Sequence, residues 1–348
     1  MKILVTGGAG FVGSHVCEYY AQKNHEVIAI DNKSRGKLLS KDLDLNYNWN
    51  YLQNKYDNVE LKLVDIRNFE TLKHLANDVE VIIHTAAQTA VTTSLVDPRT
   101  DFEVNALGTF NVLEAARQSK SNPCVVYCST NKVYGDNVNK IQVKESETRY
   151  EFADGRYSKG IPENFPTDHC EHTPYGASKY SADIYCQDYA YRNEVDTAVF
   201  RMSCIYGTRQ LGVEDQGWVA WFISAIISKK PITIFGNGKQ VRDVLYVEDL
   251  VRAYDAFLEN RDKIKHCVYN VGGGEKNTMS LLELINLIEN ETGLQSDISF
   301  AEWRPSDQKV YISDISKIHD ELKWYPKISP IIGVKKFIDW YNEYAKVL

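Results

Sequence analysis

Tyr175 and Lys179, four residues apart, form the pattern in this sequence with the clearest chemical meaning. They follow Thr173-Pro174, an expected N-cap and first-turn proline, so both side chains should project from one face of a helix. A phenol is a poor base near neutral pH because its pKa is about 10, but a neighbouring ammonium favours the phenolate. Tyr175 is then expected to take a proton from a substrate hydroxyl while Thr130 hydrogen-bonds that oxygen. The same Y-x-x-x-K spacing also arises by chance, so it needs support from the rest of the chain.

Three glycines follow the first apolar run, Lys2–Thr6, and open an amphipathic stretch over 11–22. This order of strand, turn and helix lets the backbone approach a pyrophosphate closely, and the helix N-terminus supplies N–H groups and a positive dipole. We therefore expect a dinucleotide at this turn. The expected contacts are Gly7, Gly10, Phe11, Val12 and Gly13. The alternative is that the glycines only tighten a turn.

The second expected strand, Glu26–Asp31, ends in a carboxylate. Asp31 can accept hydrogen bonds from the ribose hydroxyls and would repel a 2′-phosphate, which favours NAD over NADP. Asn32, Ser34 and Arg35 follow in the same loop and are expected to contact the cofactor too. Arg35 weakens the preference slightly, because a guanidinium nearby can tolerate a phosphate.

Further cofactor contacts are expected where the third and fourth strands end. Asp65, with Ile66 beside it, can meet the adenine amino group, although the same acid could simply cap the next helix. Ala86 and Ala87 put small side chains where a flat cofactor needs close backbone approach. The predicted set is completed by Gln88 and Asn105. No metal is expected, because the cysteines and histidines lack the spacing of a ligand set.

The elements that must position these residues alternate in type. Short β-branched runs at 2–6, 26–31, 59–64, 79–84 and 124–128 are separated by helical patterns such as 101–118. Such a series predicts an α/β fold, a doubly wound parallel Rossmann-type sheet with helices on both faces. The pattern loosens after Arg201, which suggests a smaller mixed α/β substrate lobe. We expect the NAD-binding domain at 1–202 plus about 239–272, and the nucleotide-sugar-binding lobe at about 203–238 plus 273–348.

Length and composition set outer limits on this interpretation. The 348 residues are enough for about two domains at roughly 100–200 residues each, and 43% hydrophobic with 25% charged residues is ordinary for a globular protein. A net charge of -7 argues against nucleic acid or an anionic membrane as a partner. The seven scattered cysteines and the absence of a signal peptide or membrane span predict a cytoplasmic protein with reduced thiols.

Taken together, the motifs resemble the extended short-chain dehydrogenase/reductase family of nucleotide-sugar epimerases and dehydratases. The motifs are Gly7-Gly8-Ala9-Gly10-Phe11-Val12-Gly13, Asp65-Ile66-Arg67, Thr130 with Val133-Tyr134-Gly135, and Tyr175 with Lys179. The resemblance spans nearly the whole chain. It implies NAD as the cofactor, Tyr175 as base and acid, Lys179 as the residue that lowers its pKa and holds the nicotinamide ribose, and Thr130 as the residue that positions the sugar oxygen.

Four segments are more narrowly similar to CDP-paratose (CDP-tyvelose) 2-epimerases. They are residues 129–136, 215–218, 236–244 and 306–308. That family oxidises carbon 2 of the sugar with tightly held NAD and returns the hydride to the other face of the keto intermediate. The resemblance implies an isomerase of carbohydrate metabolism that acts on a CDP-hexose, either the paratose/tyvelose pair or the glucose/mannose pair.

Dehydration is disfavoured, and two other functions stay open as alternatives. Related 4,6-dehydratases carry an Asp-Glu pair after the threonine, whereas this chain has Asn131-Lys132, so dehydration is disfavoured. A UDP-sugar 4-epimerase is the alternative within the family. A catalytically silent NAD-sensing scaffold is the alternative from another class, and the presence of Thr130, Tyr175 and Lys179 argues against it.

The acidic chain must meet a nucleotide diphosphate with local cations. A guanidinium fork suits phosphate oxygens, and Arg209, Arg242 and Arg304 lie in the later part of the chain. The resemblance marks Arg242 and Arg304 as substrate contacts, with Asp307 at the ribose. The predicted substrate set is completed by Thr130, Asn131 and Gln240. Each arginine could instead form a surface ion pair.

Two features concern the rest of the assembly. Tyr175 follows Thr130 by 45 positions, more than is usual in related epimerases, which implies an insertion near 150–171 that shapes the sugar pocket or an oligomer contact. A homodimer or homotetramer is expected.

Overall fold

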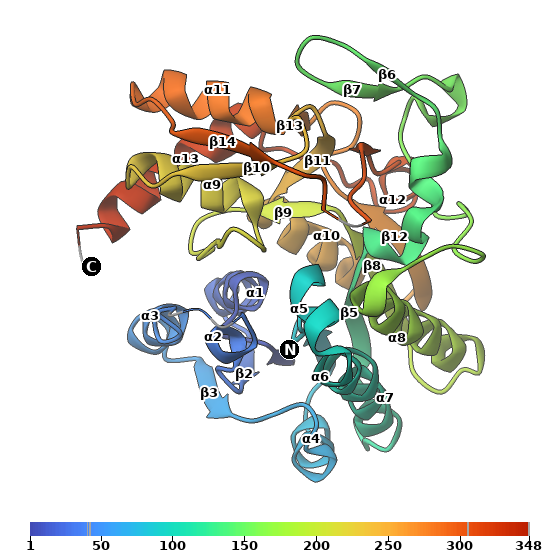
Figure 1. The fold of residues 1–348 in the computed structure, drawn as a ribbon. Coiled ribbons are helices and arrows are strands. Elements are labelled where there is room, and N and C mark those ends of the chain that lie inside the picture. Colours follow the sequence, from blue (N-terminus) through green and yellow to red (C-terminus); the bar gives the residue numbers. More distant parts are fainter. Residues whose placement is uncertain (40, 42, 305, 347–348) are drawn as a thin grey trace. The chain divides into compact units, whose positions relative to one another are not determined.

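The computed structural model describes residues 1–39, 41, 43–304 and 306–346 (Figure 1). The chain divides into two compact units. Unit 1 comprises Met1–Val133, Thr173–Arg201 and Ala253–Tyr269, and unit 2 comprises Tyr134–His172, Met202–Arg252 and Asn270–Leu348. Each unit is described separately.

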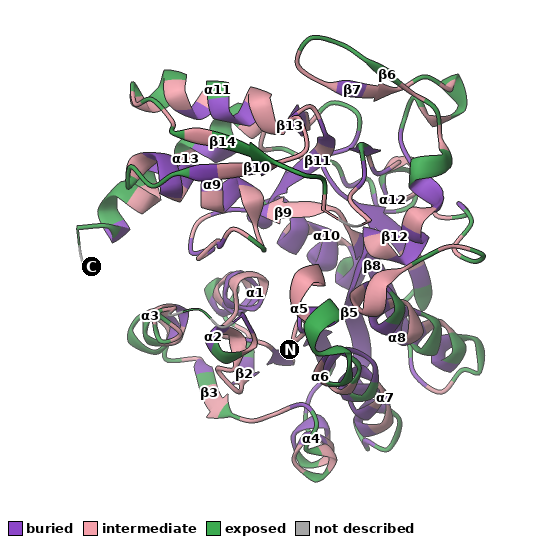
Figure 2. Ribbon diagram, viewed as in Figure 1, coloured by how far each residue is buried: buried purple, intermediate pink, exposed green. Residues whose placement is uncertain are grey.

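A parallel sheet, seven-stranded in the described part of the chain, carries the N-terminal motifs. Its strands are β1 (Lys2–Thr6), β2 (Glu26–Asp31), β3 (Val59–Leu63), β4 (Val81–His84), β5 (Cys124–Thr130), β8 (Thr197–Met202) and β12 (His266–Val271), in the order β12-β8-β5-β4-β1-β2-β3. β1 pairs in parallel with β2 on one side and with β4 on the other, so the strand order reverses beside β1. Strands such as β4 and β5 are buried throughout, as their runs of Val, Ile and Cys require (Figure 2). The predicted α/β doubly wound fold is confirmed.

Helices of unit 1 connect and cover these strands. They are α1 (Phe11–Gln22), α2 (Arg35–Leu39), α3 (Tyr47–Lys55), α4 (Phe69–Ala76), α5 (Val91–Val96), α6 (Pro98–Phe102), the π-helical turn η1 (Glu103–Leu107), α7 (Gly108–Arg117) and α8 (Thr173–Tyr191). Helices α4 and α7 pack together, as do α7 and α8, while α1 packs with α3. The helical pattern expected over 101–118 is therefore interrupted by a π-helical turn, which places Asn105 inside it.

Unit 2 is a mixed α/β assembly. Its strands are β6 (Val143–Glu145), β7 (Tyr150–Phe152), β9 (Cys204–Tyr206), β10 (Ile232–Phe235), β11 (Val241–Tyr246), β13 (Thr278–Ser280), β14 (Ile298–Ala301) and β15 (Val310–Tyr311). Its helices are α9 (Trp218–Ile227), α11 (Leu281–Thr292), α12 (Ser316–Leu322), α13 (Pro330–Tyr344) and the short η3 (Gly155–Tyr157); η2 (Asn131–Lys140) and α10 (Val247–Asn260) each cross from one unit into the other. β11 pairs with β9, β13 and β15, and β10 pairs with β14.

The unit boundaries differ from the domain boundaries expected from the sequence. The segments 134–172 and 239–252 belong to unit 2, although the expected NAD-binding domain included them. The physical reason is strand pairing: β11 joins β9, β13 and β15, whereas β12 joins the seven-stranded sheet. Apolar periodicity identifies both as buried strands but does not reveal their partners.

Three further findings concern the chain as a whole. All seven cysteines are free thiols. Within the ranges that the structure describes, no helix is both long and apolar enough to cross a bilayer. Among the same residues, no cluster of His, Cys, Asp or Glu has the arrangement of a metal site.

Candidate functional site

The turn between β1 and α1 has the shape of a dinucleotide cradle. Gly7 has a φ of +67°, and its carbonyl accepts the Gly10 N–H at 2.9 Å, which bends the chain into the start of α1. A Cβ at Gly13 would lie 2.1 Å from the Gly7 carbonyl oxygen, and one at Gly7 would lie 2.8 Å from the Ala86 backbone. Only glycine fits both positions. The turn therefore leaves bare backbone beside a helix N-terminus, as a pyrophosphate requires.

The end of β2 places Asp31 directly beside this turn. Its carboxylate accepts the Ala9 N–H at 3.2 Å and the Lys33 N–H at 2.7 Å. Burial raises the pKa of Asp31, while these backbone donors oppose the rise. The carboxylate thus stands where sequence spacing predicts the ribose of a dinucleotide.

The loops after β2 and β3 are joined by a side-chain contact. Asn32 donates to Asp65 at 2.9 Å, and Asn32 also accepts the Ser34 N–H at 3.0 Å. Arg67 donates to Asp65 and lowers the pKa of that carboxyl to about 2, so Asp65 is ionised at neutral pH. Arg35 begins α2 after the same loop, and burial lowers its pKa to about 10, so the guanidinium still carries its charge.

Gln88 and Asn105 meet below the end of β4. The Gln88 N–H donates to the Asn105 side chain at 2.9 Å, and Asn105 donates back to the Gln88 carbonyl at 3.0 Å. Both side chains also donate to Asp101, at 2.9 and 3.1 Å, and the Ser178 hydroxyl donates to the same carboxylate at 2.5 Å. All four residues are buried. The network fixes helix α8 against the π-helical turn η1.

Asp101 and Ser178 did not enter the predicted site. A signal for Asp101 was present, because it lies four positions before Asn105, on the same expected helix face. π-helical turns inside helices are frequent at functional sites, but the sequence pattern does not reveal one.

The predicted catalytic residues gather within unit 1. Thr130 ends β5, while Tyr175 and Lys179 stand one turn apart on α8. Thr173 accepts the Gly176 N–H at 3.4 Å, as expected of the residue that opens this helix. The Thr130 side chain is near enough to the Tyr175 phenol to lower its pKa. The fold therefore brings the predicted base and the predicted substrate-positioning hydroxyl near one another.

The charge state of this group differs from the expectation. Burial raises the pKa of Tyr175 to about 12, and the hydrogen bond from Thr130 only partly opposes it. Lys179 does not point its ammonium at the phenol; Nζ donates to the Cys128 carbonyl at 2.6 Å and lies 4.3 Å from the centre of the Tyr127 ring. Burial lowers the pKa of Lys179 to about 8. Sequence spacing predicts that both residues lie on one helix, as they do, but it does not show which oxygen the ammonium meets.

A second buried network supports the same helix and strand. Asp183, one turn beyond Lys179, accepts both Nε and a terminal nitrogen of Arg201 at 3.0 and 3.1 Å. The Ser129 hydroxyl, next to Thr130, donates to Asp183 at 2.6 Å. A buried charge pair that meets a bidentate partner is well satisfied, so α8, β5 and β8 hold one arrangement.

His84, at the end of β4, takes no part in proton transfer. Its ring nitrogens bond to the hydroxyls of Thr6 at 2.6 Å and Thr109 at 2.9 Å, and the side chain is fully buried. Burial, followed by the charge of Lys179, lowers its pKa to about 3. The interpretation of His84 as a satisfied core residue is confirmed.

The cations predicted for a diphosphate lie in unit 2, each in a defined environment. Arg242 on β11 forms an ion pair with Asp307 at 2.6 Å. Arg304 pairs with Asp215 at 3.0 Å, and its guanidinium lies 3.9 Å from the centre of the Phe235 ring. These partners hold the two arginines in fixed orientations.

The remaining predicted substrate residues occupy separate places. Gln240 donates to the Phe235 carbonyl at 2.7 Å. Arg209 is buried and has a φ of +62°. Asn131 lies in unit 1, next to Thr130. Residue pattern does not reveal that Phe235 and Asp215 orient Arg304, because both lie far from it along the chain.

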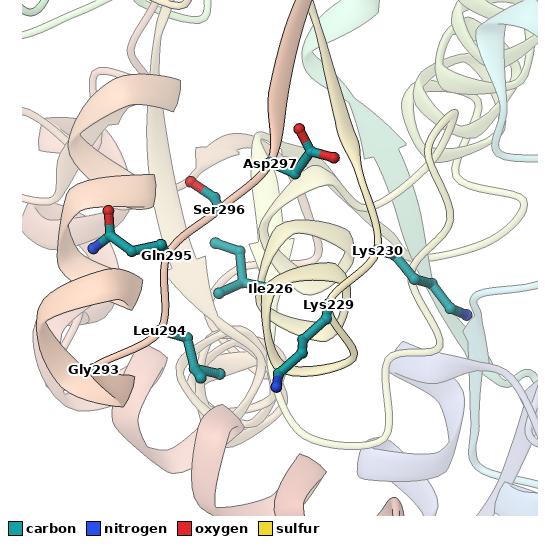
Figure 3. Close-up of a pocket in the computed structure, with 8 residues that line it drawn as sticks. All are labelled: Ile226, Lys229, Lys230, Gly293, Leu294, Gln295, Ser296 and Asp297. Atoms are coloured by element: carbon teal, nitrogen blue, oxygen red, sulfur yellow. The ribbon is translucent and has the colours of Figure 1, made fainter.

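A shallow pocket of about 330 Å³ in unit 2 contains none of the predicted site residues. It is lined by Ile226, Lys229, Lys230, Gly293, Leu294, Gln295, Ser296 and Asp297 (Figure 3). The two lysine side chains are exposed and point in different directions. Nothing in this pocket gathers polar groups on a common point.

Fold and cradle together define an NAD-dependent enzyme of the Rossmann class. Residues 3–272 match the NAD dependent epimerase/dehydratase family, and the chain belongs to that family. The cofactor prediction is confirmed, and the structure fits it: the glycine turn is packed so tightly against its own backbone that only glycine fits at Gly7 and Gly13, and a carboxylate stands at the end of β2.

Particular relatives cover the chain almost completely. CDP-paratose 2-epimerase of Salmonella typhi is 41% identical over 347 residues, which are 98% of this chain and 99% of the relative. UDP-glucuronate 4-epimerase of Thermodesulfobacterium geofontis is 29% identical over 99% of this chain and 97% of the relative. Among solved structures, the UDP-glucuronic acid 4-epimerase of Bacillus cereus, in complex with UDP-glucuronic acid and NAD, has a TM-score of 0.82 at 28% identity and covers 99% and 100% of the two chains.

Proposed function

We propose that this chain is an NAD-dependent nucleotide-sugar epimerase that inverts carbon 2 of a CDP-hexose. The observation that carries the proposal is that one unit holds the dinucleotide cradle, Thr130 at the end of β5, and Tyr175 with Lys179 one turn apart on α8. The substrate assignment is supported by the 41% identity to CDP-paratose 2-epimerase over the full length of both chains.

Unit 1 is proposed to hold the cofactor. The pyrophosphate would lie on the glycine turn, the ribose at Asp31, and the adenine near Asp65. Ala86 at the end of β4 leaves backbone exposed to a flat ring, and Lys179 would bond the nicotinamide ribose. When bound, NAD supplies the oxidising power: it takes a hydride from the sugar carbon and later returns it.

The chain's own residues supply the proton chemistry. Tyr175 takes the proton of the sugar hydroxyl, and Thr130 hydrogen-bonds the same oxygen and holds it in place. The buried phenol has a pKa of about 12, so it needs positive charge nearby before it can act as a base at neutral pH. The ammonium of Lys179, one helical turn away, is the protein's contribution to that charge. The sugar passes through a 2-keto form whose opposite face is then reduced.

Unit 2 is proposed to bind the nucleotide diphosphate. Arg242 and Arg304 present guanidinium groups that are already oriented by Asp307, Asp215 and Phe235, which lowers the entropy lost when phosphate binds. Asp307 is proposed to accept from the nucleotide ribose with its remaining lone pairs. Arg209, Gln240 and Asn131 complete the proposed substrate contacts.

The competing function is 4-epimerisation of a UDP-sugar, which is what several relatives are named for. Incubating the purified protein with CDP-glucose, CDP-paratose, UDP-glucose and UDP-glucuronic acid, followed by product NMR, separates the two. A product inverted at carbon 2 of a CDP-sugar supports the proposal. Inversion at carbon 4 of a UDP-sugar, or no turnover of any of the four, contradicts it.

The oligomeric state is proposed to be a homodimer or homotetramer that uses the outer face of α5, α6, η1 and α8. These elements pack against one another in unit 1 and expose large apolar side chains to solvent. They are Leu95, Val96, Phe102, Leu107, Ile184 and Tyr185. A large exposed apolar patch often marks a protein–protein interface. Light scattering on the wild type and on a Phe102→Asp, Ile184→Asp variant tests it, and a monomeric wild type would refute it.

A cytoplasmic location is proposed from the seven free thiols.

A further inference from the structure

A hairpin lies between Thr130 and Tyr175 in the chain. β6 and β7 pair in antiparallel register, with Val143 opposite Phe152 and Glu145 opposite Tyr150. The loop between the two strands is exposed, whereas Tyr150 is buried (Figure 2). A hairpin of two strands is marginal in isolation, so it must be held by something else in unit 2.

The hairpin is held by the loop over residues 236–240, which connects β10 to β11. The Tyr150 N–H donates to the Lys239 carbonyl at 2.9 Å, and the Tyr150 hydroxyl accepts from the Asn237 side chain at 2.7 Å. Lys239 in turn donates to Glu145 at 2.8 Å and to the Ser146 carbonyl at 3.1 Å. Backbone, amide and charge contacts thus converge on five consecutive residues.

The same loop is fixed from a second side by α11. The Leu282 N–H donates to the Gly238 carbonyl at 3.1 Å. Glu283, one residue on, accepts two hydrogen bonds from Arg149 of the hairpin, at 2.9 and 2.8 Å, and also closes the capping box at the start of α11. Hairpin, loop and helix therefore form a closed ring of contacts.

The 236–240 loop runs directly into the proposed diphosphate contacts. Gln240 is the last residue of the loop, and Arg242 is the second residue of β11. Between them, Val241 packs with Tyr150 and Val310 in a small buried cluster that includes Phe152 at its edge. A displacement of the hairpin would move the start of β11, and with it both side chains.

We propose that the hairpin positions the substrate-binding side chains of β11, with Tyr150 as the positioning residue that fixes the 236–240 loop. This inference rests on the proposed function, because it needs Gln240 and Arg242 to meet a nucleotide diphosphate. Tyr150 itself acts through Asn237 and the backbone of the loop. Loss of the contact therefore weakens nucleotide binding and leaves the proton chemistry of Tyr175 unchanged.

The test removes one hydroxyl from the contacts between the hairpin and the 236–240 loop. Tyr150→Phe keeps the ring in its cluster and deletes the acceptor for Asn237; Tyr157→Phe removes a hydroxyl from the same segment, where the ring packs against Phe152 and Phe165. Calorimetry with CDP on the NAD-loaded protein should give a Kd raised about threefold to tenfold for Tyr150→Phe and unchanged for the control. KM for the CDP-sugar should rise in parallel, with kcat and NAD content unchanged.

A second variant tests the same hairpin–loop contacts at an exposed position. Glu145→Lys sets a like charge against Lys239, which should loosen the loop and raise the Kd for CDP. If the added lysine only attracted the anionic nucleotide, the Kd for CDP would fall instead. The direction of the change in Kd therefore separates loss of loop positioning from simple electrostatic attraction. If the wild type binds neither CDP nor UDP, the proposed function fails. If it binds CDP and both variants bind it equally well, or if kcat falls without a change in Kd, the positioning role is refuted.

Discussion

Replacing Lys179 by methionine should make the cofactor-free protein more stable while it destroys activity. The Lys179 ammonium is 3% exposed, and burial lowers its pKa from 10.5 to about 8. At 1.36 kcal/mol per pH unit, keeping this group charged in the folded protein costs about 3 kcal/mol at pH 7. Methionine preserves most of the side-chain volume and loses the bond to the Cys128 carbonyl, worth about 1 kcal/mol, so the net gain is about 2 kcal/mol.

The sign of the pH dependence follows from the lowered pKa. The cost of the buried ammonium is fully present below pH 8 and disappears as the pH rises towards the unfolded value of 10.5. The advantage of Lys179→Met over the wild type should therefore shrink by about 2 kcal/mol between pH 7 and pH 9.5. An exposed lysine of the same unit, changed by Lys263→Met, provides the control and should show no such trend.

Urea unfolding at pH 7 and pH 9.5, followed by tryptophan fluorescence, measures the difference in free energy of unfolding between variant and wild type. NAD must be removed first, because a ligand bound to the native state adds its own stability. Turnover of the NAD-loaded variant should fall at least about a hundredfold, since the ammonium proposed to bond the nicotinamide ribose is lost. A variant less stable than the wild type at pH 7, or an advantage independent of pH, would refute the reasoning from burial.

Four further changes probe the base, the cofactor site and the buried network around Asp101. Tyr175→Phe should lower turnover by about 10²–10⁴ with NAD content unchanged, as measured by stopped-flow NADH absorbance. Because a pKa of about 12 leaves little phenolate at neutral pH, wild-type kcat/KM should climb with pH across the neutral range. A flat pH–rate profile would contradict the assignment of Tyr175 as the base. Gly13→Ala should yield protein without NAD, because its Cβ would lie 2.1 Å from the Gly7 carbonyl oxygen; full NAD content after purification would show that the turn can relax. Asp31→Ser should raise the affinity for NADP relative to NAD, measured by fluorescence titration, and an unchanged ratio would mean that the carboxylate does not select. Asp101→Asn should cost about 1–3 kcal/mol in urea unfolding, since it puts a donor against the Ser178, Gln88 or Asn105 donors; an unchanged midpoint would mean that the network is dispensable.

Much of unit 1 could be predicted because its information is local. The runs at 2–6 and 26–31 are strands with those bounds, and the glycine turn between them is followed by a helix over Phe11–Gln22. Periodicity and turn chemistry decide such features within a few residues of chain. The spacing of Tyr175 and Lys179 likewise predicts a shared helix face, and both lie on α8.

The architecture of unit 2 depends on which strands pair, and the sequence pattern does not show this. β11 joins β9, β13 and β15, whereas β12 joins the seven-stranded sheet. The hairpin at Val143–Phe152 is held by the 236–240 loop, which lies about ninety residues away along the chain.

By itself, the sequence determined which side chains could do chemistry here and which secondary-structure elements carry them, because residue type, spacing and local periodicity are properties of short stretches of chain. Tertiary structure alone decided their electrostatic state and their partners. Burial raised the pKa of Tyr175 and lowered that of Lys179, the Cys128 carbonyl took the ammonium, and Asp101 and Asp183 became the buried anchors of α8. Desolvation and long-range hydrogen bonding depend on the distances between residues far apart in sequence, and those distances exist only once the chain has folded.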